Sequence, residues 1–404
     1  MLSQSDAEDF ALLTDDKLSE KLFDVKMTRI FQNALGPDVH LVNSEECGWL
    51  MQGGDSSTDF KPDFHVTVKG LYMHKEEPDD AVQEARRLVH ETYGTVFRFG
   101  TPPKELWGMI TILERKLKFT EGRDFGQVIR YLQHLNNHHE GGNAVLFDKT
   151  RCWLIRAREK NVLYSIENVD WLAGGSKEKF VNFVHSSLQP WKGLILDACN
   201  HFNVDLVNEK AFLGTGATGR VFKVCRTTNG KTNYYALKIV LKPNNLSLIS
   251  ECRMLKAAEK TGVVVSVVGE FKQFGNGTGG GLLISPVGVP VNRAKLTQSL
   301  LHRVAKVLFA LHLEGLQHGD PRLPNLIQFK RQLYWIDLMA SILDGEYRWR
   351  EDASALSRSV LGLHQDDNLP ENITALIDQY ALDKNEAACL ALADGWWSEL
   401  QFQS

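Results

Sequence analysis

A glycine-rich run followed by a strand with one lysine constrains the fold of this chain more than any other feature. The run reads LGTGATGRV and contains Gly214, Gly216 and Gly219 between two short apolar stretches. Glycines let backbone N–H groups approach phosphate oxygens that a Cβ would hold away, although the run alone could also be an ordinary hairpin turn. The next predicted strand, Tyr234–Val240, alternates and directs Lys238 toward the side on which the glycine loop folds. Together they predict a phosphate-binding site.

Carboxylates and a carboxamide follow in an order that suits phosphate chemistry. Glu251 lies on the predicted helix Leu246–Glu259 and could fix the lysine ammonium group. The run HGDPRLPN then places Asp320 five residues before Asn325, and two short predicted strands lead to Asp337. Hard oxygen ligands of this kind suit Mg²⁺ that bridges nucleotide phosphates. The alternative makes Asp320 a turn residue and Asp337 a strand cap, but it leaves the shared order of five elements unexplained.

Together these motifs resemble the protein-kinase-like fold over about residues 205–400. The resemblance implies that Asp320 orients or deprotonates the acceptor hydroxyl. It also implies that Asn325 and Asp337 hold Mg²⁺, and that Lys238 contacts the α and β phosphates of ATP. ATP and Mg²⁺ are therefore the expected cofactors.

Two further segments would complete a nucleotide site under this resemblance. Val221 ends the glycine motif, and Leu282–Gly288, which reads LLISPVG, resembles the strand and hinge that receive adenine. Pro286 has no N–H group, so the backbone donor to the purine is expected from Val287 or Gly288.

Several residues depart from the kinase pattern. The catalytic loop has His-Gly-Asp in place of His-Arg-Asp, and Asp337-Leu338-Met339 replaces Asp-Phe-Gly, so regulation through an activation-loop phosphate is not expected. Only 14 residues separate Asp337 from Glu351, which indicates that the usual peptide-docking segment is shortened or absent. Asp352 resembles the aspartate that opens the helix under the catalytic loop. His-Gly-Asp also occurs in kinase-like small-molecule phosphotransferases, so the acceptor need not be a protein.

The N-terminal half carries a second arrangement of charged residues on predicted strands. Asp63 precedes the predicted strand His65–Val68. A later strand, Ile110–Lys116, presents Glu114 and Lys116 on one face because strand side chains alternate. Carboxylates from two adjacent strands can share a divalent ion, and a nearby lysine can steady the attacking water or the charged phosphate. Phosphodiester hydrolysis requires both functions.

This arrangement resembles the PD-(D/E)xK nuclease fold. The resemblance implies that Asp63, Glu114 and Lys116 form the core motif. It also implies that Gln127 lies beside them on the next helix and that Glu20 could serve as an extra metal ligand. The alternative is that these charged residues form a solvated strand edge.

Composition excludes several other classes of protein. Lys and Arg number 46 against 50 Asp and Glu, so the chain, with a formal net charge of −4, is no polycation. Residues 104–160, with eleven basic and seven acidic side chains, are the part suited to nucleic acid. Six cysteines stand singly, which indicates neither a disulfide framework nor a zinc site. No apolar run is long enough to span a bilayer and no signal peptide is visible, so a soluble protein is expected.

The expected architecture has two domains. Residues 1–190 are predicted to form an α/β nuclease-like domain with a mixed sheet flanked by helices, and residues 191–404 an α+β bilobal kinase-like domain. Apolar periodicity predicts helices over Asp16–Leu35, Pro78–Tyr93, Phe125–Leu135, Lys177–His185, Gly193–Phe202 and Leu296–Leu311. The pairing of the two domains resembles Crinkler-type effectors of oomycetes and fungi and related fungal-type kinases, although the LFLAK-like header is missing. The resemblance implies secretion and a virulence role in the host nucleus or cytoplasm.

The favoured function is an ATP- and Mg²⁺-dependent phosphotransferase. It would be a Ser/Thr protein kinase, or an autophosphorylating enzyme, whose acceptor is a protein, including a host protein. One alternative is a metal-dependent nuclease or DNA-binding effector with a second divalent ion at Asp63 and Glu114 and a regulatory kinase-like half. The other is a pseudokinase scaffold that binds nucleotide and a partner without turnover.

Overall fold

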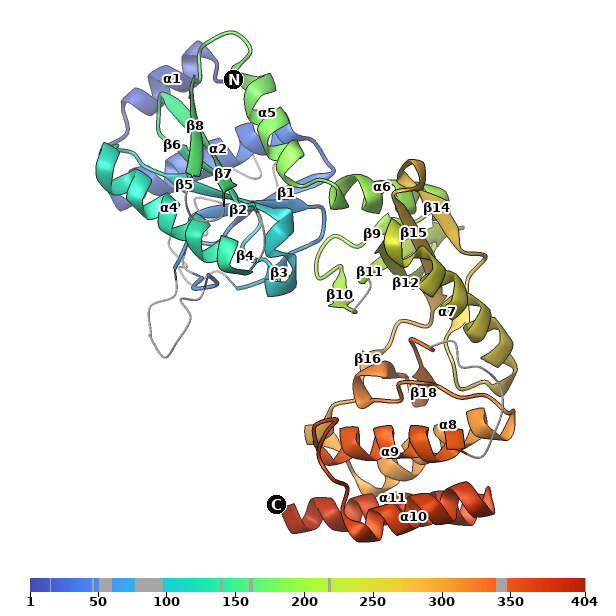
Figure 1. Cartoon of the computed structure of the whole chain (residues 1–404). Helices are drawn as coiled ribbons and strands as arrows, with labels where there is room; N and C mark the ends of the chain where they lie inside the picture. Colours follow the sequence, from blue (N-terminus) through green and yellow to red (C-terminus); the bar gives the residue numbers. More distant parts are fainter. Residues whose placement is uncertain are drawn as a thin grey trace. The chain divides into compact units, whose positions relative to one another are not determined.

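The chain divides into two units (Figure 1). Unit 1 comprises Met1–Cys199 and Asp205–Thr215, and unit 2 comprises Asn200–Val204 and Gly216–Ser404. The predicted helix Pro78–Tyr93 lies outside the described residues. The structure, a computed structural model, describes residues 1–14, 16–45, 47–50, 60–76, 97–138, 141–159, 163–216, 219–338 and 347–403.

A six-stranded sheet forms the centre of unit 1. Its strands lie in the order β1, β2, β5, β6, β7, β8, and neighbours are antiparallel except for β5 and β6, which are parallel. Parallel neighbours need a crossover, and α4 provides it. The strands are β1 (Val39–Asn43), β2 (Phe64–Val68), β5 (Ile110–Arg115), β6 (Asn143–Phe147), β7 (Arg151–Glu159) and β8 (Leu163–Asp170), and a separate pair joins β3 (Met73–His74) to β4 (Gly100–Thr101).

Helices cover both faces of this sheet because side chains alternate along its strands. Leu113 and Val145 lie in a core shared with α1, α2 and α5, whereas Ile112 and Ala144 lie in a core shared with α4. Unit 1 is therefore a layered α/β structure, as expected for the N-terminal half. Its helices are α1 (Gln4–Ala11), α2 (Lys17–Leu35), α4 (Glu121–His138), α5 (Ser176–Ser187), the 3-10 helix η1 (Lys104–Met109), and α6 (Trp191–Phe202), whose last residues fall in unit 2.

Unit 2 begins with an antiparallel sheet and one helix. Strands β11, β12, β15 and β13 pair in this order, and β14 pairs with β15. The buried side chains Leu248, Cys252 and Leu255 of α7 belong to the core of this unit. The elements are β11 (Gly219–Thr228), β12 (Lys231–Leu241), α7 (Asn245–Ala258), β13 (Ser266–Val267), β14 (Lys272–Phe274) and β15 (Gly279–Ser285).

The rest of unit 2 is mostly helical. The hydroxyl of Thr297 accepts a hydrogen bond from the N–H of Leu300. Thr297 is therefore the N-cap of α8, whose first helical residue is Gln298. The largest side chains of the helical core, Trp335, Tyr380 and Trp396, are fully buried. The elements are the three-stranded sheet β16 (Val289–Pro290), β17 (Leu326–Phe329) and β18 (Gln332–Trp335), and the helices α8 (Gln298–Leu313), α9 (Tyr347–Leu361), α10 (Glu371–Asp383) and α11 (Glu386–Gln403).

The segment before unit 2 contains two short strands, β9 (Asp205–Leu206) and β10 (Phe212–Thr215). It is bonded to the rest of unit 1, since the N–H of Lys210 donates to the carbonyl of Tyr72 and the N–H of Ala211 donates to that of Gly70. Across the described ranges, no helix combines the length and the apolar character needed to cross a membrane. The expected mixture of sheets and helices is confirmed in this coarse form.

Candidate functional site

Lys238 lies at the centre of a buried ionic cluster in unit 2. Its strand β12 pairs with β11 at Val221 and with β15 at Leu282, which fixes the direction of the lysine side chain. The ammonium Nζ is 2.6 Å from Oε2 of Glu251 on α7 and 2.6 Å from Oδ1 of Asp337 after β18. The structure thus brings together three residues that the sequence analysis selected from separate segments.

Two members of the cluster, Lys238 and Glu251, are buried, which strengthens the interaction between their charges. Burial alone would lower the pKa of Lys238, but the carboxylates of Glu251 and Asp337 outweigh burial and raise the pKa above its ordinary value. Burial also raises the pKa of Glu251, and the charge of Lys238 opposes that shift. The lysine is therefore a fixed positive charge, suited to hold phosphate oxygens.

The catalytic loop places Asp320 beside two donors. The amide Nδ2 of Asn325 donates to the backbone carbonyl of Asp320 at 2.9 Å and to its Oδ2 at 3.0 Å. The guanidinium of Arg322 donates to the same Oδ2. Arg322 was not predicted as a site residue. Its position two residues after Asp320, in a run that favours phosphate chemistry, could have indicated it.

A buried carboxylate holds this loop in place. Asp352 of α9 accepts hydrogen bonds from the backbone N–H of His318 at 2.7 Å and of Gly319 at 3.1 Å. Its Oδ2 is also 3.2 Å from Nε2 of His312, whose Nδ1 is 2.8 Å from the hydroxyl of Tyr380. Three buried side chains, those of Asp352, His312 and Tyr380, therefore support the backbone that carries Asp320.

Asn325 and Asp337 are connected by backbone bonding. The N–H of Ile336 donates to the carbonyl of Asn325 at 2.9 Å, so the residue before Asp337 is tied to the catalytic loop. The side chain of Asp337 is 44% exposed, and its φ of 62° lies in the left-handed region. A carboxylate and a carboxamide oxygen fit Mg²⁺, which takes its other ligands from phosphates and water. Such a pair would hold the metal that neutralises phosphate charge.

The glycine motif and the predicted hinge are tightly packed at two positions. A Cβ on Gly219 would lie 2.5 Å from the carbonyl oxygen of Ile239, and one on Gly288 would lie 2.8 Å from that of Gln328. The N–H of Gly216 donates to the carbonyl of Gly219 at 2.9 Å and closes the loop. Ala217 and Thr218, between these glycines, lie outside the described residues. At Gly214 there is room for a Cβ, and Val287 of the predicted hinge is partly buried.

Unit 1 contains a second cluster around Glu114. Its Oε1 accepts hydrogen bonds from Nζ of Lys116 at 2.6 Å and from Nε2 of Gln127 at 2.8 Å. The N–H of Asp63 points to Oε2 of Glu114 at 3.4 Å. The structure therefore brings together Asp63, which precedes β2, Glu114 of β5, Lys116, which follows β5, and Gln127 of α4.

The two carboxyl groups of this cluster, on Asp63 and Glu114, are close enough for the negative charge of one to disfavour ionisation of the other. Burial, and then the neighbouring charge of Asp63, raise the pKa of Glu114 to about 8, although Lys116 opposes the shift. Burial also raises the pKa of Asp63 above its usual range. Among the described residues, no three His, Cys, Asp or Glu side chains are grouped so as to hold a metal ion. A divalent ion here would accordingly rest on two carboxylates, and its charge would favour their ionised forms.

Arg115 lies between Glu20 and this cluster and contacts both. Its guanidinium is 2.7 Å from Asp24, 3.2 Å from Glu45 and 3.5 Å from Glu20, and its backbone N–H donates to Asp63 at 2.8 Å. The carboxylate of Glu20, predicted as an extra metal ligand, is thus paired with Arg115. Arg115 was not predicted as a site residue, because the alternation of β5 directs its side chain to the face opposite Glu114.

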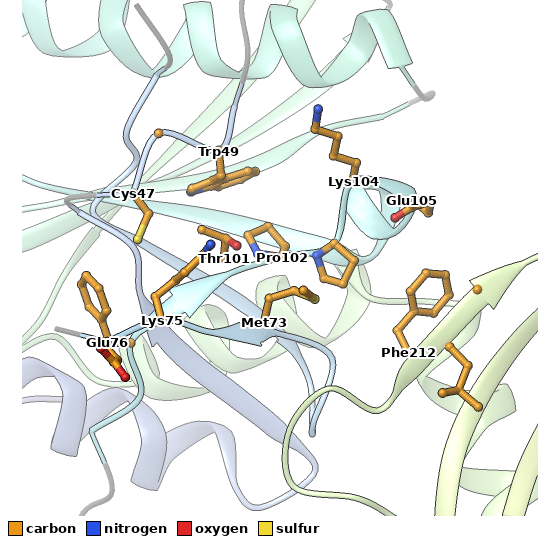
Figure 2. Close-up of a pocket in the computed structure, with 15 residues that line it drawn as sticks. Cys47, Trp49, Met73, Lys75, Glu76, Thr101, Pro102, Lys104, Glu105 and Phe212 are labelled. Carbon is orange, nitrogen blue, oxygen red and sulfur yellow. The ribbon is translucent and has the colours of Figure 1, made fainter. Parts of the chain in front are cut away.

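The structure also contains a cavity of about 800 Å³ in unit 1 that was not predicted from the sequence, although Gly214 of the glycine motif lines it (Figure 2). Trp49, Met73 and Pro102 supply apolar walls, and Lys75 and Glu105 supply charges. Neither Glu114 nor Asp63 lines it. This cavity is therefore separate from the predicted nuclease-like residues.

Comparisons with known proteins give little guidance. No protein-family model matches this chain, and no curated protein matches it. Among solved structures, the chain is similar to a mutant of the kinase domain of Mycobacterium tuberculosis PknI, with 16% sequence identity and a TM-score of 0.35. The match covers 49% of this chain and 95% of that chain.

Proposed function

We propose that unit 2 is an ATP- and Mg²⁺-dependent phosphotransferase with a kinase-like fold. The observation that supports the proposal is the bridge from Lys238 to both Glu251 and Asp337, since it joins the strand, the helix and the segment that would hold phosphate and metal in the proposed nucleotide site. Mg²⁺, when bound, would neutralise the negative charge of the phosphates. Lys238 would hold the α and β phosphate oxygens, and Asn325 and Asp337 would hold the metal.

Asp320 would act on the acceptor. Its Oδ2 would take the proton of an approaching hydroxyl, and the Asn325 amide keeps the carboxylate oriented. Arg322, whose side chain is 58% exposed, could turn from Asp320 toward the transferred phosphate. The favoured acceptor is a serine or threonine of a protein, including this protein itself. Membership of a Crinkler-type effector, with action in a host cell, stays a prediction.

The first test is the intact mass of the protein after incubation with Mg-ATP and a generic protein acceptor. We expect added phosphate on the wild type or the acceptor, and at least a hundredfold slower transfer by Asp320→Asn. The matched control is Asp383→Asn, which makes the same change at an exposed carboxylate of α10. ATP binding without transfer by the wild type would replace the proposal with a pseudokinase scaffold.

A metal-dependent nuclease in unit 1 is the second candidate function. The specific observation in its favour is that Glu114 contacts Lys116 and Gln127 beside Asp63, because two carboxylates and a lysine can hold a metal-bound water near a phosphodiester. Plasmid nicking in Mg²⁺ or Mn²⁺ should be lost in Glu114→Gln and kept in Glu167→Gln, an exposed glutamate of β8. If no divalent ion supports cleavage by the wild type, this candidate is wrong.

A further inference from the structure

A second cavity, in unit 2, opens beside the predicted catalytic aspartate. Its volume is about 830 Å³, and its walls come from the catalytic loop, from α9 and from the residues that follow α9. Asp320 and Arg322 line it from the loop, and Arg350, Ser354 and Arg358 line it from α9. A molecule in this cavity would therefore contact the group that is proposed to accept a hydroxyl proton.

Hydrogen bonds fix the catalytic loop along α9 at two points. The N–H of Gly319 donates to Oδ1 of Asp352 at 3.1 Å, and the N–H of Leu323 donates to Oγ of Ser359 at 2.9 Å. Asp320 lies in the chain between these two anchors. The cavity and the aspartate thus share a wall whose geometry is set by backbone bonds.

The α9 wall carries a regular row of polar residues. Arg350, Ser354 and Arg358 follow one another at intervals of four, which places them on one face of the helix over a length of about 12 Å. That length matches about four residues of extended peptide. The guanidinium group presents a fork of N–H donors that suits carboxylate and phosphate oxygens.

The contacts of the two arginines in this row with neighbouring residues still allow an anionic ligand to bind them. Arg350 pairs with Asp378, and both side chains are 53% exposed. Exposed pairs of this kind contribute little, so a ligand carboxylate can displace Asp378. Arg358 donates its Nε–H to the backbone carbonyl of Asp367 at 3.2 Å. A carbonyl has no net charge, so this bond does not neutralise the positive charge of Arg358. Glu351 also lines the cavity, and it would repel an acidic ligand at the end of α9 nearest Arg350.

We propose that this cavity receives a peptide acceptor whose serine or threonine is flanked by acidic residues. The inference rests on the proposed function. The hydroxyl oxygen lies at Asp320, and the flanking carboxylates or phosphates bind Arg350 and Arg358. In the transfer, the hydroxyl oxygen bonds to the γ phosphorus while the bond from that phosphorus to the β–γ bridging oxygen breaks. The bridging oxygen keeps the electron pair in ADP, and the proton moves to Asp320.

The test uses the full chain, Mg-ATP and three peptides that differ only in the residues flanking one serine. The flanks are glutamate, alanine or lysine. We expect kcat/KM for the glutamate peptide to exceed that for the alanine peptide at least tenfold, with the lysine peptide lowest. The preference should shrink as salt rises, because exposed charges are screened.

A charge reversal in the cavity provides the matched variant. Arg358→Glu should reverse the order and favour the lysine peptide, whereas Arg331→Glu, at an exposed arginine between β17 and β18, should keep it. Equal rates on all three peptides, or faster transfer to the lysine peptide by the wild type, would overturn the inference and leave the phosphotransferase intact. The absence of any phosphate transfer, to peptides or to the protein itself, would overturn both. Mg-ATP binding, measured for each variant, shows that the variant is folded.

Discussion

Two buried basic residues, Lys238 in unit 2 and Arg115 in unit 1, hold together carboxylates from distant parts of the chain. Lys238 contacts Glu251 and Asp337, and Arg115 contacts Asp24 and Glu45 among others. Each carboxylate in such a cluster depends on the shared cation, because a buried charge without a partner is costly. Removing either cation therefore affects both the stability of its unit and the chemistry of its site.

Replacing Lys238 with methionine should produce both effects, on stability and on phosphotransfer. Glu251 is 7% exposed and would lose its cation, so Lys238→Met should lower the free energy of unfolding by about 3 kcal/mol. Phosphotransfer should fall at least a hundredfold, because a fixed positive charge at the phosphates is lost. Both quantities can be measured by urea unfolding and by intact mass. Lys256→Met is the control and should change neither, since Lys256 lies on α7, the helix that carries Glu251, and makes an exposed pair with Glu270.

The raised pKa of Glu114 predicts a pH dependence of stability in unit 1. The group has a pKa of about 8 when folded and about 4.5 when unfolded, so between these values the folded state binds the extra proton. Stability should therefore fall as pH rises from about 4.5 to 8, by at most about 1.4 kcal/mol per pH unit. Urea unfolding at several pH values should show this slope in the wild type. Glu114→Gln should flatten it, and an unchanged slope in that variant would contradict the prediction.

At the residue scale, sequence motifs were informative where the chemistry is local. Lys238, Asp320 and Asn325 were selected from their own short runs. Arg115 was missed because its function depends on Asp24, 91 residues earlier, and no spacing along the chain reports that contact. Ion pairs of this kind need the folded structure.

The glycine motif allows a prediction about β11 and β12. A Cβ on Gly219 would lie 2.5 Å from the carbonyl oxygen of Ile239 and 2.7 Å from a methyl group of Val240. Gly219→Ala should therefore push the two strands apart and lower the free energy of unfolding by about 1–3 kcal/mol. Gly214→Ala makes the same chemical change where no atom lies within 4 Å, so its unfolding midpoint should stay close to that of the wild type. Equal losses in the two variants would show that packing is not the cause.

Helix α9 supports the catalytic loop through Asp352. The variant Asp352→Ala removes the acceptor of the His318 and Gly319 N–H groups, which should leave the buried N–H of His318 unpaired. We expect faster amide hydrogen exchange over residues 318–323 and at least a tenfold loss of phosphotransfer. Asp366→Ala, at an exposed position after α9, is the control and should change neither. Protection of the loop that survives in Asp352→Ala would contradict its role as an anchor.

Helices could be predicted from the sequence where apolar residues recur along one face. The predicted helices Asp16–Leu35 and Leu296–Leu311 are confirmed as α2 and α8 within a few residues. Strand β1 was not predicted, because it is short and buries the polar residues His40 and Asn43 beside its apolar ones. Strand β8 was not predicted either, since most of its side chains are exposed and give no alternating pattern. Burial of polar residues and exposure of apolar ones are decided by neighbouring elements.

At the scale of the whole molecule, the two ionic clusters are complete within separate units. The contacts of Lys238, Glu251, Asp337 and Asp320 all lie in unit 2, and those of Asp63 and Glu114 lie in unit 1. Within the described residues, the contacts recorded for each cluster come from its own unit. The chemistry of each can therefore be removed by one substitution.

This separation predicts that the two proposed activities are independent. Asp320→Asn should abolish phosphotransfer and keep metal-dependent nicking, and Glu114→Gln should do the reverse. In the double variant each activity should fall as it does in the corresponding single variant, because substitutions in separate units that share no partners have additive effects. Intact mass and plasmid nicking on the same four preparations measure both activities. If Glu114→Gln lowered phosphotransfer more than about threefold, a departure of about 0.65 kcal/mol from additivity, one unit would control the other.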